Sequence, residues 1–412
     1  MPTVRFPGDN WPKGLRIALW TIVLVVVAVP VVVRALADPH FGLNLADEQP
    51  QLNRDFPAHF RFARAVVLEG LATRTAGEAG SVYTAAAHES VLQSWTGHAN
   101  TPALPFAYSP TMLWLLLPLM PLPVPWAYAV WTAASLAAWV WAAQRAQLSL
   151  LPSLAALLSP LALWAVALGQ TALLTLAGLV FLATSEPRSR RGVWSAGLVL
   201  WALTAKPPLA VTAAAALLAS GQTGVVLRAG LLTLVSTVAA WPWLGPNWVS
   251  DYVYLVTHYT VDQADPAFAW ILQPAYMSNL RATLVLYLGT ADATAARVST
   301  LAWAASLLAL VGMAVWRRWE IGRVWATAVL AYLLLSPHVN STEDLHLLLL
   351  GWPAVAVVPG WPAVSPAVPA AVVWLSPGNA PVQGWRWPLL VVIAKLAAGC
   401  RRAYLSIGRA GP

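Results

Sequence analysis

The stretch LRIALWTIVLVVVAVPVVVRAL, Leu15–Leu36, contains 22 residues, and only Arg16 and Arg34 among them are charged. An α-helix needs about 20 predominantly apolar residues to span the ~30 Å hydrocarbon core of a bilayer. The apolar run is longer than the apolar region of a signal peptide, which has about 7–15 residues, so we expect a retained membrane helix and not a signal peptide. This segment therefore assigns the chain to the membrane.

The composition of the whole chain supports the same assignment. Of its 412 residues, 59% are hydrophobic and 10% are charged, which leaves too little polar surface to cover a soluble globule. The net charge of +8 does not predict a nucleic-acid partner, because in a membrane protein the positions of Lys and Arg are more informative than their number. The single cysteine, Cys400, excludes an internal disulfide framework and a cysteine-based metal cluster. We expect one all-α, polytopic membrane domain over residues 1–412.

Basic residues mark the expected topology, because the positive-inside rule places them in the cytoplasm. They are Arg5, Lys13, Arg16, the segments 186–192 and 317–323, Arg401, Arg402 and Arg409. About twelve spans result, with both termini on the cytoplasmic side of the plasma (inner) membrane. The expected spans are 15–36, 107–122, 124–143, 169–184, 192–205, 207–220, 227–244, 297–316, 323–337, 345–359, 364–376 and 385–400. The apolar segments 150–167 and 279–289 break the alternation, and we expect each to re-enter the membrane or to lie on its surface.

The regions between the spans differ in length and chemistry. Residues 37–106 are the first extracytoplasmic loop, residues 245–296 are a second outer loop, and residues 360–412 contain Pro-rich last spans and a basic cytoplasmic tail. In this topology all seven histidines lie on the outer side. We therefore expect an extracytoplasmic active site, although long loops also collect polar residues without a functional reason.

The first outer loop contains an amphipathic segment, NRDFPAHFRFARAVVLEG (Asn53–Gly70). Its apolar residues recur every three to four positions from Phe56 onward, which predicts an interfacial helix that begins at Asp55. One interpretation is that Asp55 only caps this helix, because Pro57 lies in its first turn and Asp is a preferred capping residue. The functional alternative is a general base at the membrane surface, with His59 one turn away to tune it.

Further polar residues occur at the outer ends of the expected spans. Gly169 and Gln170 open the span 169–184, and Lys206 lies in a tight AKPP turn between two apolar runs. A basic group at that depth usually has an anionic partner, and a phosphate at the headgroup level would suit it. The alternative is a lysine that snorkels to the interface beside Trp201.

The segment SPHVNSTEDLH, Ser336–His346, joins two later spans at the outer face. A zinc site built from His338, Asp344 and His346 is one interpretation, but their spacing fits no standard motif and no fourth ligand is evident. We therefore expect no metal here. The preferred interpretation is a hydrogen-bonding lobe for a sugar or a phosphate next to the outer leaflet.

The order of these motifs resembles glycosyltransferase family 87: an Asp at the start of an amphipathic helix, YSP (Tyr108–Pro110), GQ, KP, and SPH followed by DLH. This family consists of polyprenol-phosphate-mannose-dependent mannosyltransferases with the membrane-embedded GT-C fold, a bundle with interfacial helices in its first outer loop. The resemblance covers most of residues 1–360. It implies that Asp55 is catalytic and that the outer loops, with Tyr108 and Gln170, contact the phosphate and sugar of the donor.

A sugar on a lipid phosphate already has a good leaving group, so the enzyme must deprotonate the acceptor hydroxyl and stabilise the departing phosphate. We expect Asp55 to do the first, and Lys206 with Arg61 and His338 to do the second. One displacement implies inversion. The lack of a DxD pair or acidic cluster in the sequence argues against an obligatory metal and a nucleotide-sugar donor, and we expect no cofactor. The secondary candidates are His59, Asp344 and His346.

Two other functions also fit the sequence. A GT-C enzyme that transfers arabinofuranose or another pentose would share nearly every feature. A lipid or solute transporter would also be polytopic, but it normally has polar or broken helices near the midplane, and here charges avoid the span centres. The partners expected for the preferred function are a polyprenyl-phosphate sugar donor, a glycolipid or cell-envelope glycan acceptor, and membrane lipids.

Overall fold

The structure of the protein, a computed structural model, describes residues 43–44, 51–52, 55–70, 81–96, 105–146, 153–154, 157–185, 187, 189–258, 274, 277, 279–317, 319, 321–339 and 346. The regular elements of these parts are helices apart from one pair of two-residue strands, so the expected all-α class is confirmed for them. The elements are, in chain order, β1 (Leu43–Asn44), β2 (Gln51–Leu52), α2 (Asp55–Leu68), α4 (Ala85–Thr96), α5 (Thr111–Leu116), η2 (Leu117–Leu119), α6 (Val124–Arg145), α8 (Pro160–Leu168), α9 (Ala172–Thr184), α10 (Arg190–Leu203), α11 (Pro207–Ala219), α12 (Thr223–Leu244), α13 (Trp248–Thr257), α14 (Leu280–Leu288), α15 (Asp292–Arg317) and α16 (Ile321–Leu335).

By length and composition, α12 and α15 can each cross a membrane. Both helices carry a strongly exposed apolar face. On α12, Leu227, Leu231 and Leu234 are 68%, 51% and 61% exposed, and on α15, Leu301 and Leu308 are 70% and 75% exposed. Their spacing places them on one side of each helix. Water would disfavour such faces whereas hydrocarbon does not, so the described helices fit a membrane protein.

Two further pairs of apolar helices are bent sharply. The segment of α5 and η2 meets α6 at 110°, and the second part of α8 meets α9 at 116°. If each bent pair is one span, the described residues contain up to four candidate spans. Pro118, Pro121 and Pro123 interrupt the first pair, because proline cannot donate the helical hydrogen bond. Gly169 ends α8 in the left-handed conformation and so causes the second bend.

The expected spans in the described region coincide with helices, but several of these helices are short. α9, α10, α11 and α16 contain 13, 14, 13 and 15 residues. A straight crossing needs about 20 residues, so these helices do not qualify by length. The described residues therefore show two to four candidate spans and not the expected twelve. The expected spans 15–36, 364–376 and 385–400, and all of 345–359 except His346, lie outside the described residues.

The two segments that we expected to break the alternation contain short, capped helices. Ser159 caps α8 by accepting a hydrogen bond from Ala162 N at 3.3 Å, and Asn279 caps α14 by accepting one from Ala282 N at 3.0 Å. Each helix has nine residues and ends at a glycine in the left-handed conformation. Neither helix alone is long enough to cross a bilayer, and α8 is also one half of the second bent pair.

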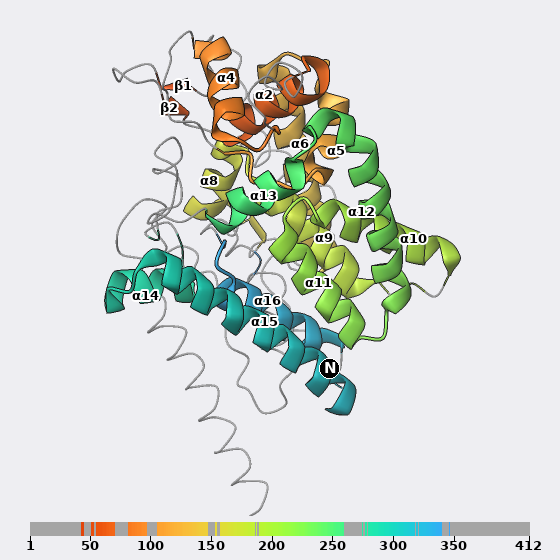
Figure 1. Ribbon diagram of the computed structural model, residues 1–412. Coiled ribbons are helices and arrows are strands. Elements are labelled where there is room, and N and C mark those ends of the chain that lie inside the picture. The colour runs from red at the N-terminus through yellow and green to blue at the C-terminus, as the bar shows by residue number, and fades with distance from the viewer. Residues whose placement is uncertain are drawn as a thin grey trace, which may run out of the picture.

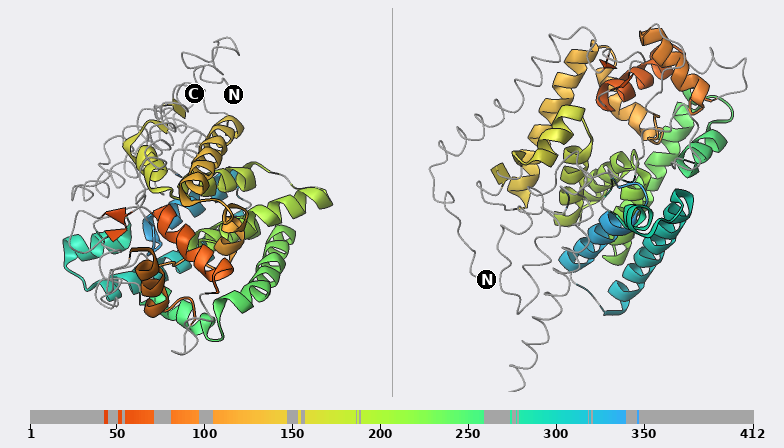
Figure 2. Two further views of the ribbon diagram at one scale, coloured as in Figure 1. Left: turned by 90° about the horizontal axis from the view of Figure 1, so that it is seen from above. Right: turned by 90° about the vertical axis from the view of Figure 1, so that its left-hand side faces the viewer.

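Buried apolar side chains form two clusters. One lies among α6, α8 to α11, α15 and α16, and it contains Trp139 and Trp325. The other joins α2, α4, α5, the first part of α6 and the end of α12, and it contains Phe60, Phe106 and Tyr128. Figure 1 shows α2, α4 and α5 together at the top and α14 to α16 across the lower part, and Figure 2 shows the same separation from the side. The helices α2 and α4 thus belong to a separate apolar core, which continues into the bundle.

α10 and α12 lie side by side and run in the same direction. Near the end of α10, Trp201 Nε1 donates to Ser236 Oγ at 2.9 Å, and earlier in both helices Gly197 lies against Arg228. The starts of the two helices therefore lie at one end of the bundle, and their C-terminal ends lie at the other.

These directions define the two ends of the bundle. At the end where α12 meets α13, here called the α13 end, Val82 N of the expected first outer loop donates to Leu244 O at 3.1 Å. At the opposite end, the basic end, α6 terminates at Arg145, whose Nε donates to Thr184 Oγ1 at 3.0 Å. Arg190, the first residue of α10, lies at the basic end too. Val82 and α13, which belong to the expected outer loops, thus lie at the opposite end of the bundle from Arg190. The expected topology is wrong between the spans 124–143 and 169–184, where the chain with its segment 150–167 was expected to stay on the outer side. Arg145 lies at the basic end and Gly169 lies beside Phe56 near the α13 end, so the chain between them passes from one end of the bundle to the other.

Candidate active site

Asp55 is the first residue of α2, and its carboxylate meets an amide from a distant part of the chain. Gln170 Nε2 donates a hydrogen bond to Asp55 Oδ2 across 115 residues of sequence. Gln170 is buried and Asp55 is half-buried. Capping a helix is a local interaction and does not require such a partner. The structure therefore brings together two residues that the sequence suggested separately.

Gly169 positions Gln170 at the start of α2. Its φ of +69° is one that side-chain-bearing residues rarely adopt, and a Cβ there would lie 2.4 Å from Phe56 Cβ. Two side chains of α6 hold the same turn: Trp131 Nε1 donates to Gly169 O at 2.9 Å, and Tyr128 Oη donates to Val166 O at 2.7 Å. The turn can approach α2 this closely because glycine has no side chain.

Lys206 lies immediately before α11, whose first two residues are prolines. The YSP segment forms hydrogen bonds with Thr204 and Ala205, the two residues before Lys206. Ser109 N donates to Ala205 O at 3.2 Å, and Ser109 Oγ donates to Thr204 O at 2.6 Å. Lys206 lies close enough to Asp55 for its positive charge to act on the pKa of that carboxyl. Segments around positions 55, 108, 170 and 206 thus converge at the α13 end.

Burial raises the pKa of the Asp55 carboxyl from 3.8 to about 6, and the charge of Lys206 opposes this rise. The rings of Phe56 and Phe60, which stack at 5.4 Å, contribute to the apolar surroundings of this helix turn. A carboxyl with a pKa just below neutral is ionised at pH 7, yet it is more basic than an ordinary aspartate. The site therefore has the electrostatics of a general base next to a cation.

His59 lies one turn after Asp55 and packs against the YSP segment. Its ring is 4.9 Å from the ring of Tyr108 and 5.8 Å from that of Phe106, both edge-on. Burial, with His88 and Lys206 as further causes, lowers the pKa of His59 to about 3, so the imidazole is neutral at physiological pH. Tyr108 O accepts a hydrogen bond from Tyr83 Oη at 3.1 Å. The rings of His59 and Tyr108 thus pack together one helical turn from Asp55.

Arg61 has different surroundings from those expected of a phosphate ligand beside Asp55. Its guanidinium carbon stacks 3.7 Å above the ring of Trp95 in α4. Burial, and then the charge of Arg64, lowers the pKa of Arg61 to about 10. Six residues along a helix correspond to about 9 Å of rise and a different face. The contacts described for Arg61 therefore join α2 to α4 and do not bring it to Asp55.

The second polar segment lies partly within the described residues. His338 follows α16 in a turn and is partly exposed. His346 is buried against the start of α9, where its Nε2 lies 3.1 Å from Thr175 Oγ1 and 3.2 Å from Ala172 O. Because Gln170 lies two residues before the start of α9, His346 lies near the same turn that serves Asp55. Asp344 lies outside the described residues.

A metal centre was the alternative for this second segment. In the part of the chain that the structure describes, no group of three or more His, Cys, Asp and Glu side chains is arranged to hold a metal ion. His346 instead bonds to α9.

Sequence reasoning missed several residues that support the site. The carbonyl of Thr204 accepts the hydrogen bond from Ser109 of the YSP segment, and its hydroxyl lies 2.8 Å from Thr111 Oγ1 at the start of α5. His88 Nε2 accepts a hydrogen bond from Phe106 N at 2.8 Å, and its ring stacks on Phe62. For His88 the only sequence signal was a histidine in the expected first outer loop. No sequence signal indicated the contacts of the Thr204 hydroxyl group.

These observations define a class: a helical membrane protein with a carboxylate, an amide and a lysine gathered at one end of its bundle. The model of glycosyltransferase family 87 matches residues 106–339, more than half of the chain, and the protein belongs to that family. It is therefore a membrane glycosyltransferase. No curated protein and no solved structure matches the chain. The matched range includes Tyr108, Gln170, Lys206 and His338, whereas Asp55 lies on the N-terminal side of it.

Proposed function

We propose that this glycosyltransferase moves mannose from a polyprenyl-phosphate donor to a hydroxyl group of a lipid-linked or cell-envelope glycan, with inversion. The observation that carries the proposal is the convergence of Asp55, Gln170 and Lys206 at the α13 end. A base that receives a proton and a cation that stabilises a leaving phosphate are the two groups that this reaction needs. The resemblance of the motifs to the mannosyltransferases of the family supports the choice of donor and sugar.

In the proposed step Asp55 accepts the proton of the acceptor hydroxyl. The hydroxyl oxygen then forms a bond to the anomeric carbon as the bond from that carbon to the phosphate oxygen breaks. Polyprenyl phosphate leaves with the electron pair, and the positive charge of Lys206 stabilises it. Gln170 holds the Asp55 carboxylate through its amide, which fixes the orientation of the base. The step needs no cofactor, because the lipid-linked sugar phosphate supplies the leaving group.

The remaining site residues are assigned to the donor in the same proposal. Tyr108 stacks edge-on against His59 near the base, a suitable position to contact the sugar. His338 contacts the phosphate from the turn after α16. Arg61 would have to give up its stacking on Trp95 to reach this phosphate. We therefore assign it to holding α2 against α4 and not to binding the donor.

The membrane orientation follows from the two ends of the bundle. We propose that the basic end faces the cytoplasm and the α13 end faces outward from the plasma membrane, with about twelve spans and both termini inside. The separation of Arg145 and Arg190 from the site residues supports this orientation. A polyprenyl phosphate in the outer leaflet would present its head group at the level of α2.

A donor assay tests the proposed function. Membranes that contain the protein are incubated with polyprenyl phosphates labelled in the sugar, one with mannose and one with arabinofuranose. We expect transfer of mannose to a membrane glycan, and at least about a hundredfold less transfer in matched membranes with Asp55→Asn. Transfer of the pentose alone would establish the alternative donor, and no transfer from either lipid would refute the proposal.

A further inference from the structure

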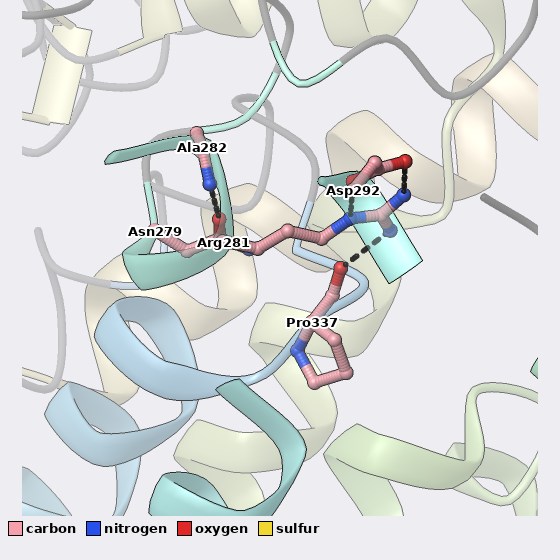
Figure 3. Close-up of polar contacts among 5 residues, drawn as sticks. All are labelled: Asn279, Arg281, Ala282, Asp292 and Pro337. Atoms are coloured by element: carbon pink, nitrogen blue, oxygen red, sulfur yellow. Dashed lines mark hydrogen bonds and ion pairs between the residues drawn. The ribbon is translucent and has the colours of Figure 1, made fainter. Parts of the chain in front are cut away.

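A buried ion pair joins the start of α15 to α14 (Figure 3). Arg281 Nε and Nη2 donate to the two carboxylate oxygens of Asp292, each at 2.6 Å. Arg281 is 0% exposed and Asp292 is 2% exposed. Burying two charges is costly, and apolar residues of similar volume often stabilise a protein equally well. Stability alone therefore explains this pair poorly.

The polar side chains around this pair hold the end of α16. Three successive carbonyls there each accept a hydrogen bond from a side chain of α14, its cap or α15: Leu335 O from Ser299 Oγ, Ser336 O from Asn279 Nδ2 at 2.7 Å, and Pro337 O from Arg281 Nη1 at 3.2 Å. The last carbonyls of a helix have no partners within it. His338 is the next residue, so two other helices fix the backbone that carries it.

We propose that Asn279 and the Arg281–Asp292 pair are positioning residues that hold the turn after α16 and thereby place His338 for contact with the donor phosphate. The inference rests on the proposed function, in which His338 contacts the donor. The pair and Asn279 act through the turn and not on the substrate. Directional hydrogen bonds to successive carbonyls fix both the position and the tilt of the turn, and displacements well below 1 Å matter in such sites.

Asn279 offers a selective test because it has two separate roles. Its Oδ1 caps α14 through Ala282 N, and its Nδ2 holds Ser336 O. Asn279→Ser keeps an oxygen that caps a helix but removes the amide donor to the turn. Arg281→Lys keeps the positive charge opposite Asp292 but removes the bidentate hydrogen bonding to its carboxylate. Ser189→Ala is the matched control, because it removes a cap of the same kind from α10 at the basic end.

The kinetic test separates positioning from general stability. We expect Asn279→Ser and Arg281→Lys to raise the donor KM about tenfold, the effect of one or two lost hydrogen bonds, with a smaller change in kcat. Ser189→Ala should leave the KM unchanged at a similar melting temperature. His338→Ala should add little to the KM effect of Asn279→Ser, because both act through the same contact. Additive effects of the two substitutions, or an unchanged KM in Asn279→Ser, would overturn the proposal.

A second measurement does not depend on the reaction and so distinguishes failure of this inference from failure of the proposed function. His338→Cys in a Cys400→Ser background places the only thiol in the turn. We expect the rate of its modification by a small thiol reagent to change several-fold when Asn279→Ser is added, since the turn is then less restrained. Ser189→Ala should not change this rate. If the rate is the same in all three proteins, the turn does not depend on Asn279 and the inference is wrong, whichever donor the enzyme uses.

Discussion

Asp55 combines two properties that a helix cap does not need, a raised pKa and a side-chain partner from α8's C-terminal turn. Asp55→Asn preserves the size of the side chain and the ability to cap α2. It removes the proton acceptor, and loss of general-base assistance typically lowers a rate by about 10² to 10⁴. We expect at least about a hundredfold loss of sugar transfer, measured with purified protein and labelled donor. Retention of most of the activity would reduce Asp55 to a cap.

The raised pKa also predicts the effect of Asp55→Asn on stability. A carboxyl whose pKa rises on folding stabilises the folded state fully below its unfolded pKa, and this contribution is lost as the pH rises through the folded pKa. For Asp55 the loss occurs between pH 3.8 and about 6. At pH 7 the variant should therefore melt at the same or a higher temperature than the wild type. The difference should shrink as the pH is lowered below 6, and a marked drop in melting temperature at pH 7 would contradict the assigned pKa.

Lys206 offers a prediction for the pH dependence of the reaction. Its charge lowers the pKa of Asp55, so Lys206→Gln should raise that pKa above 6. The rate of transfer should rise with pH as Asp55 loses its proton, and in Lys206→Gln this rise should be displaced to higher pH and accompanied by weaker donor binding. Lys206→Arg retains the charge and serves as the control. Identical profiles for wild type and Lys206→Gln would leave Lys206 as a snorkelling anchor.

At the scale of elements, the turn between α8 and α9 decides whether Gln170 reaches α2. Gly169→Ala would place a methyl group 2.4 Å from Phe56 Cβ and would also strain the backbone at a φ of +69°. Gly221→Ala is a matched control, because its φ is +74° but no atom lies within 4 Å of the added Cβ. We expect Gly221→Ala to lose about 1 kcal/mol of stability and keep its activity. Gly169→Ala should lose more stability and most of its activity, measured by melting temperature and transfer rate. Equal effects of the two substitutions would show that the close approach to Phe56 does not matter.

At the scale of the whole molecule, the two ends of α12 should lie on opposite sides of the membrane. Ser250 in α13 and Ser189 before α10 are both exposed and lie at the α13 end and the basic end. In a Cys400→Ser background, Ser250→Cys should react with an impermeant thiol reagent added outside intact cells, and Ser189→Cys should react only after permeabilisation. The reverse labelling pattern would invert the proposed membrane orientation and place the candidate site on the cytoplasmic side.

The sequence alone determined the class of the protein, because the length and polarity of an apolar run are local properties that a bilayer selects. The starts of helices were also predictable where a capping residue or proline marks them, as at Asp55 and Pro207. Asp55 was identified as the start of an amphipathic segment, and Gln170 and Lys206 were identified as polar residues at the ends of apolar segments. The count of twelve spans was not shown, since several described helices are too short for a straight crossing and the bends at prolines and at Gly169 depend on packing.

Tertiary structure decided which of these residues meet. The hydrogen bond from Gln170 to Asp55 depends on the missing side chain of Gly169 and on two aromatic side chains of α6, which no local pattern reveals. The stacking of Arg61 on Trp95, which separates it from the base, has no sequence signature either. The Arg281–Asp292 pair joins the starts of α14 and α15, and no local sequence pattern predicts it. Periodicity and polarity report the environment of a residue along its own helix, whereas partners are chosen by how distant helices pack, and that information is distributed over the whole chain.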